Sequence, residues 1–238
     1  MATNPDAALD ELARGLTAAL GDGLVSLMLY GSSARGTQVA GRSGLDVLLV
    51  LKDAGAAALH KAAPVLAAWA RGGNPPPLIQ SEADWKASAD VFPIEVEDIR
   101  EAHRVLAGRD VTAEVTTTRD DQRRELEREA RGKLIRLRAE YAVAAGDGAT
   151  LAELLARASG TFLVLFRAAL RLQGGPLPEA PAEVVRATAR AAGFDPQPFE
   201  RALGSRASVP APALQAHDAA AAAYLEAVQK FVAWIDQA

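Results

Sequence analysis

Residues 29–51 read LYGSSARGTQVAGRSGLDVLLVL, in which a Gly-Ser turn and a polar loop separate two apolar segments. The runs Leu24–Tyr30 and Leu45–Leu51 are rich in leucine and valine and are too short for helices, so both are predicted strands. A Gly-Ser turn at the end of a strand suits phosphate, because backbone N–H groups and small hydroxyls can approach it closely. The stretch therefore predicts a phosphate-binding turn beside a strand that carries one acidic residue, Asp46.

The residues of this stretch match most of what phosphoryl or nucleotidyl transfer needs. Gly31, Ser32 and Ser33 supply the tight turn. Two Mg²⁺ ions would be held by carboxylates, and residues i and i+2 of a strand point to the same face. Asp46 meets this requirement, but the residue two positions earlier is Gly44, which has no side chain to bind a cation.

Further charged residues are candidates for the same site. A third strand is predicted at 91–97, where Glu95 and Glu97 share the face opposite the apolar residues. Either glutamate is a candidate for the third metal-binding carboxylate, and the solvent face of an edge strand is the alternative for both. Arg35, just after the turn, is a candidate for neutralising phosphate charge, with a surface position as the alternative.

The pattern of apolar residues changes between the two halves of the chain. The first half predicts helix, strand, strand, helix and strand in that order, which indicates a small mixed sheet with flanking helices. From residue 120 onward only helical periodicity remains, which predicts an up-and-down bundle. We therefore expect an α+β fold with an α/β domain at 1–115 and a helical bundle domain at 116–238.

Composition excludes several classes of protein. A formal net charge of −4 gives no strong signal for nucleic acid, and half of the 238 residues are apolar, enough to form a core. The chain has no cysteine, which excludes disulfides and thiolate metal sites and is compatible with a cytoplasmic location. The first residues lack the apolar region of a signal peptide, and the most apolar run, TFLVLFRAALRL, is too short and too charged to span a membrane.

The segments GSSARG and RSGLDVLLV resemble the signature of the DNA polymerase β-type nucleotidyltransferase superfamily, in which a Gly-Ser pair is followed by a loop and an S-D-x-D strand. By this resemblance Gly31 and Ser32 are the phosphate-binding pair, and Asp46 is the second metal-binding aspartate. Glu95 matches the third acidic position. The first aspartate of the family falls on Gly44, where this sequence departs from the pattern.

Other segments extend the resemblance. GNPPPLI and DVFPIEVEDIREAHRVLAGRD resemble a bacterial subgroup of nucleotidyltransferase-like proteins, and the helical half resembles the bundle of aminoglycoside nucleotidyltransferases. The resemblance implies Mg²⁺ and a nucleoside triphosphate as cofactors, and transfer of a nucleoside monophosphate to a hydroxyl on a small molecule or a protein. Because of Gly44, the alternative is an inactive pseudoenzyme that binds nucleotides or partner proteins. A third interpretation, an antitoxin-like enzyme, accounts for the first half only.

Overall fold

The structure is a computed structural model that describes residues 5–39 and 44–237. The chain divides into two compact units, with the boundary between Thr118 and Arg119; a short stretch at Val39 groups with the second unit. The first unit contains a four-stranded sheet, and the regular elements among the described residues of the second unit are all helices joined by loops. The predicted α+β class, with a mixed sheet followed by a helical C-terminal part, is therefore confirmed.

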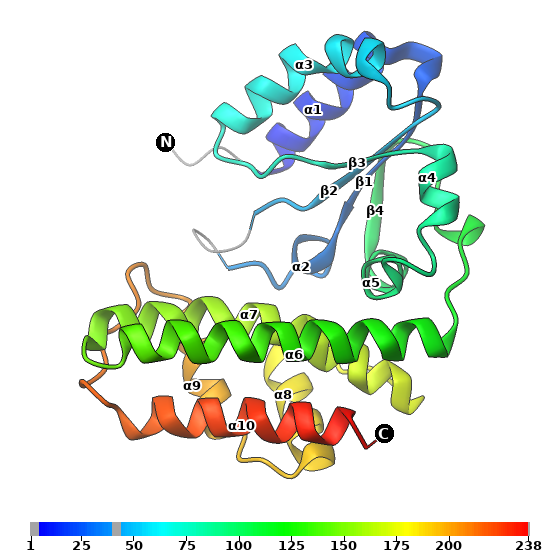
Figure 1. The fold of residues 1–238 in the computed structure, drawn as a ribbon. Helices are drawn as coiled ribbons and strands as arrows, with labels where there is room; N and C mark the ends of the chain where they lie inside the picture. Colours follow the sequence, from blue (N-terminus) through cyan, green and yellow to red (C-terminus); the bar gives the residue numbers. More distant parts are fainter. Residues whose placement is uncertain (1–4, 40–43, 238) are drawn as a thin grey trace. The chain divides into compact units, whose positions relative to one another are not determined.

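The first unit contains the elements that carry the candidate site (Figure 1). In chain order they are α1 (Pro5–Leu20), the 3₁₀ helix η1 (Gly21–Gly23), β1 (Leu24–Tyr30), α2 (Gly31–Ala34), β2 (Val47–Leu51), α3 (Ala56–Arg71), β3 (Leu78–Ser81), α4 (Glu82–Ala87), α5 (Pro93–Glu101), β4 (His103–Gly108) and the 3₁₀ helix η2 (Thr112–Glu114).

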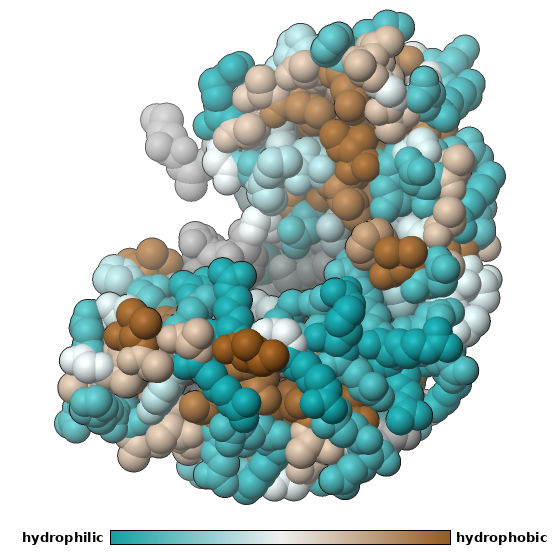
Figure 2. Space-filling model, viewed as in Figure 1, coloured by the Kyte–Doolittle hydropathy of each residue, from teal (hydrophilic) through white to brown (hydrophobic). Residues whose placement is uncertain are grey.

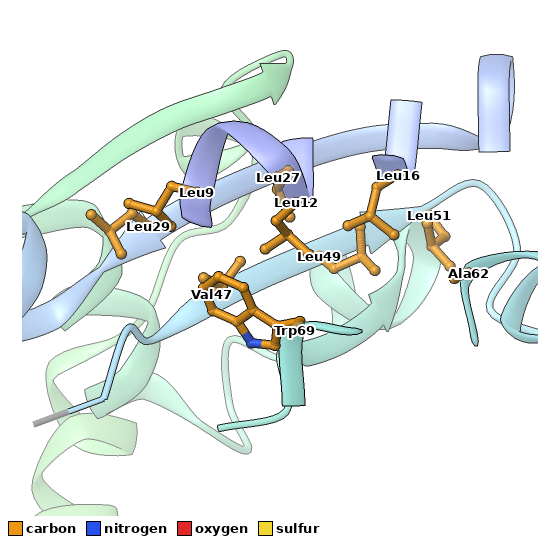
Figure 3. Close-up of a cluster of buried hydrophobic side chains, with 10 residues drawn as sticks. All are labelled: Leu9, Leu12, Leu16, Leu27, Leu29, Val47, Leu49, Leu51, Ala62 and Trp69. Carbon is orange, nitrogen blue, oxygen red and sulfur yellow. The ribbon is translucent and has the colours of Figure 1, made fainter. Parts of the chain in front are cut away.

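The sheet has the strand order β3-β2-β1-β4. Strand β1 pairs antiparallel with both β2 and β4, whereas β2 and β3 are parallel. Alternate residues of the two central strands point to opposite faces. One face packs against α1 and α3 through a core that includes Leu12, Leu49 and Trp69 (Figure 3). The other face packs against α4 and α5 through Met28 and Leu48, among others.

The strand predicted at 91–97 is wrong, because most of this segment belongs to helix α5. Pro93 stands in the first turn, where its fixed φ suits a helix and its missing N–H costs nothing. The spacing of Ile94 and Val96 fitted the alternation of a strand. In the structure both residues are buried on helix α5, together with Ile99. The edge strand that pairs with β1 is β4, which the sequence analysis did not predict.

The second unit is the predicted helical bundle. Its helices are α6 (Arg119–Ala144), α7 (Gly148–Gln173), α8 (Pro181–Ala192), α9 (Gln197–Ser205) and α10 (Ala219–Ile235). Aromatic rings fill its core, and the ring of Phe166 lies 4.6 Å from that of Phe231 and 4.9 Å from that of Phe199, centre to centre. Helix α7 is long and apolar enough to cross a membrane by length and composition alone, but half of its most apolar window is buried inside the structure.

Helix α6 presents charged residues to solvent along much of its length. Several of these residues form i,i+4 ion pairs, for example Arg123 with Glu127 at 3.0 Å and Arg136 with Glu140 at 2.7 Å. The face of the bundle seen in Figure 2 is accordingly mainly hydrophilic. These exposed pairs contribute little stability, so the apolar stripe on the opposite side of α6 holds the helix in the bundle.

Candidate functional site

The turn after β1 is formed by the short helix α2 (Figure 1). Gly31 begins this helix with a φ of 67°, a left-handed conformation that glycine adopts without strain. Two backbone hydrogen bonds close the turn: the N–H of Arg35 donates to the carbonyl of Gly31 at 3.1 Å, and that of Thr37 to the carbonyl of Ser32 at 2.9 Å. The predicted Gly-Ser turn is thus an ordered element at the end of a central strand.

The carboxylate of Asp46 lies against this turn. A Cβ atom added to Gly31 would be 3.4 Å from Oδ2 of Asp46 and 3.9 Å from Oδ2 of Asp98, so the two carboxylates converge over the glycine. The N–H of Tyr30 donates to the carbonyl of Asp46 at 2.9 Å, which extends the ladder by one residue beyond the start of β2 at Val47. Burial, followed by the negative charge of Asp98, raises the pKa of Asp46.

Arg35 and Asp98 form a largely buried ion pair. Nη2 of Arg35 lies 2.7 Å from Oδ1 of Asp98, Nη1 lies 3.4 Å from Oδ2, and Nη2 also donates to the main-chain carbonyl of Asp98 at 3.3 Å. Each side chain is only 12% exposed, and Glu101 approaches the same guanidinium at 3.6 Å. Arg35, predicted to face phosphate, therefore holds α5 against α2 in this structure.

The sequence analysis did not single out Asp98 and missed its pairing with Arg35. A helical period would have shown that Asp98 lies four residues after buried Ile94, on the same side of the helix. A carboxylate on the buried face of a helix is costly without a partner, so it predicts one. The strand prediction for this segment concealed that signal.

The two glutamates predicted as alternatives for the third carboxylate occupy different surroundings. Glu97 accepts hydrogen bonds from Arg100 and from the hydroxyl of Thr117, each at 2.5 Å. Glu95 stands in the first turn of α5, is exposed, and lies near enough to Tyr30 for its charge to act on the phenol. Of the two, Glu95 is therefore the one whose charge acts on Tyr30, on which the charge of Asp46 also acts.

Tyr30, the last residue of β1, lies among these acidic groups and was not singled out from the sequence. Burial, and then the negative charges of Asp46, Glu95 and Asp98, raise its pKa to about 12. The phenol therefore stays neutral at physiological pH. Its side chain is partly buried and packs against the cluster of buried residues between the sheet and helices α4 and α5.

Gly44 does not simply leave an open position beside Asp46. A Cβ atom added to Gly44 would lie 2.6 Å from Cδ and 2.7 Å from Cγ of Pro75, closer than real Cβ contacts. The hydroxyl of Ser33 donates to the carbonyl of Gly44 at 3.0 Å, so this hydroxyl is already engaged within the turn. The loop between α3 and β3 thus occupies the space that a side chain at position 44 would need.

The residues at this site do not fit a two-metal centre. Among residues 5–39 and 44–237, no three Asp, Glu, His or Cys side chains are grouped closely enough to hold a metal ion. Position 44 has no carboxylate, and Asp98 is already neutralised by Arg35. The predicted metal ligands Asp46 and Glu95 therefore lack the third member that such a cage requires.

Comparison with known proteins supports the fold. No protein-family model and no curated protein matches the sequence. Among solved structures, the chain is similar to the spectinomycin adenyltransferase AAD(9) of Enterococcus faecialis, whose crystal structure contains ATP and spectinomycin. The TM-score is 0.60 at 13% identity, and the match covers 96% of this chain and 99% of that one. Over nearly its whole length, this chain therefore has the fold of a nucleotidyltransferase.

Proposed function

We propose that this protein binds a nucleoside triphosphate at the turn Gly31–Arg35 and is a nucleotidyltransferase-like protein with a degenerate metal site. The observation that carries the proposal is the convergence of the Gly31 turn and the Asp46 carboxylate at the end of β1. The fold that surrounds them is that of an enzyme crystallised with ATP, and this supports a nucleotide as the ligand.

The turn offers the groups that a phosphate chain needs. The first N–H groups of a helix have no acceptor within the helix, so those of α2 are available to an anion. Gly31 has no side chain to hold the phosphates away from the backbone, and Ser32 adds a hydroxyl. Arg35 keeps α5 against the turn by holding Asp98, which makes it a positioning residue in this proposal.

Transfer to an acceptor is expected to be weak. A hydroxyl of a small molecule or of a protein is the acceptor class that the fold favours, and a cytoplasmic location fits a user of nucleotides. Loss of a group that acts in the transition state lowers a rate by orders of magnitude. The pairing of Asp98 with Arg35 and the absence of a side chain at Gly44 favour a second candidate, a pseudoenzyme that binds nucleotide without turnover.

Calorimetry and a labelling assay test the proposal together. ATP and GTP are titrated into the wild-type protein with and without Mg²⁺, and labelled nucleotide is then incubated with hydroxyl acceptors. We expect binding that Asp46→Asn alters and that Asp22→Asn, an exposed change at the other end of β1, leaves unchanged. Absence of nucleotide binding to the wild-type protein would overturn the proposal.

The labelling assay separates the two candidates. Labelled product that disappears in Asp46→Asn identifies a weak enzyme with Asp46 in its site. Nucleotide binding without product identifies the pseudoenzyme. Product formed equally well by Asp46→Asn would show that the site lies elsewhere.

A further inference from the structure

The space beside Asp46 is filled by a part of the fold that is itself firmly held. Pro75 is the first of three consecutive prolines in the loop that connects α3 to β3. Its ring atoms Cγ and Cδ are the atoms that a side chain at position 44 would meet, at 2.7 and 2.6 Å. A proline ring is closed on its own backbone nitrogen, so these atoms cannot swing aside as the end of a flexible side chain would.

Pro75 is anchored from behind by the core of the first unit. The indole N–H of Trp69 donates to the carbonyl of Pro75 at 2.7 Å. Trp69 is only 5% exposed and packs beside Val47, the first residue of β2 (Figure 3). The side-chain amide of Asn74 donates back to the carbonyl of Trp69 at 3.3 Å. Moving the proline would therefore disturb a buried tryptophan and its hydrogen bonds.

Gly44 is anchored as well. The Ser33 hydroxyl holds its carbonyl at 3.0 Å, and two residues later the carbonyl of Asp46 accepts from the N–H of Tyr30. What requires glycine at this position is the proximity of Pro75.

We propose that Pro75 has taken the place of a first metal-binding carboxylate, so that the site cannot regain a two-metal centre by a change at position 44 alone. The proposal rests on the proposed function for its metal-binding consequence, but the contact itself can be tested without any ligand. It predicts that Gly44→Asp fails as a repair, and that Gly44→Asp combined with Pro75→Ala succeeds. Pro75→Ala removes Cγ and Cδ and keeps only Cβ, which lies 3.8 Å from the added atom.

The first experiment measures the contact through stability. Gly44→Ala is compared in the wild-type and Pro75→Ala backgrounds by thermal unfolding. We expect Gly44→Ala to lower the Tm by about 5 °C in the wild-type background, since overpacking a filled site is destabilising, and to have little effect when Pro75 is alanine. Gly23→Ala is the control, because Gly23 belongs to the same unit, has no positive φ and has nothing within 4 Å of its added Cβ. An equal Tm loss in both backgrounds, or no loss in either, would overturn the proposal.

The second experiment measures metal binding directly. Mn²⁺ alone, and then Mn²⁺ with ATP, is titrated into the wild type, Gly44→Asp, Pro75→Ala and the double variant. The double variant should bind Mn²⁺ at least about tenfold more tightly than Gly44→Asp, a difference of about 1.4 kcal/mol. A gain in Gly44→Asp equal to that in the double variant, or no gain in the double variant, would overturn the proposal. If ATP binds to none of the four proteins, the proposed function fails, while the Tm comparison still decides whether Pro75 blocks position 44.

Discussion

The ion pair between Arg35 and Asp98 gives the sharpest prediction about the stability of the site. Arg35→Met keeps most of the length and apolar contact of the side chain but removes the guanidinium. The carboxylate of Asp98 is then left buried without the guanidinium that balances its charge, and Glu101 lies near the same position. Removing one partner of a fully buried pair costs about 3–5 kcal/mol, and we take about 3 kcal/mol because each side chain here keeps 12% of its surface exposed.

Urea unfolding followed by circular dichroism measures this loss. With a slope of about 2 kcal/mol per molar urea, the transition of the first unit should move down by about 1.5 M. Arg104→Met is the matched control, because Arg104 pairs with Asp6 at 2.9 Å on the surface of the same unit, with 53% and 71% of the two side chains exposed. Exposed pairs contribute about 0–1 kcal/mol, so this control should shift the transition by less than about 0.5 M.

A double variant separates the pair from other effects of the substitution. Asp98→Asn in the Arg35→Met background removes the unbalanced charge and should recover more than half of the lost stability. The reasoning is refuted if Arg35→Met costs no more than Arg104→Met. It is refuted equally if the losses from Arg35→Met and Asp98→Asn simply add, because then the two side chains do not stabilise one another.

Three further predictions concern protonation. The folded state raises the pKa of Asp46 above its ordinary value of 3.8, so the free energy of unfolding falls as the pH rises from 3.8 through the raised value. Asp46→Asn should therefore be more stable than the wild type above this pH range and not below it, as measured by urea unfolding across pH. Tyr30→Phe should remove the component of the ultraviolet tyrosinate titration near pH 12, and an unchanged titration would place the perturbed phenol elsewhere. Hydrogen bonds from the Thr150 hydroxyl and then from the Ala149 N–H lower the pKa of Asp147, the N-cap of α7. The ionised cap therefore stabilises the folded state above pH 3.8, and this contribution is lost as the pH falls through the lowered pKa. Asp147→Ala should lower the Tm at neutral pH and not in strong acid.

Local patterns predicted the central part of the fold. Strand β1 was predicted with both of its ends, because a short run of leucine and valine between a glycine pair and a Gly-Ser turn has few alternatives. The helical period of Leu126, Ala130, Leu134, Leu137 and Tyr141 predicts the inner side of α6, and all of these except Tyr141 are buried. The Gly-Ser turn after β1 and the position of Asp46 beside it also follow from adjacent segments of sequence.

The sequence predictions that were wrong or incomplete have a different physical cause. In the segment that forms α5, the apolar residues Ile94 and Val96, spaced by two, fit a strand as well as a helix, and packing of the segment against the sheet decides for the helix. Contacts between segments that are distant in the sequence could not be predicted from local patterns either. Nothing in the sequence near Gly44 indicates that Pro75 lies against it, or that Arg35 reaches Asp98. These long-range contacts decide which side chains of the site are free.

The negative charge of the site is balanced partly by residues of the chain itself, whereas in a two-metal enzyme bound cations balance it. Carboxylates held close together repel one another, and bound cations normally balance that repulsion. Here Asp98 is balanced by the guanidinium of Arg35, while burial, and after it the negative charge of Asp98, raises the pKa of Asp46. Position 44 contributes no charge, and Pro75 fills the space beside it. Arg35 thus balances Asp98 from within the protein, and position 44 adds no charge that a cation would have to balance. This is the arrangement that the proposed nucleotide site with a degenerate metal centre would have.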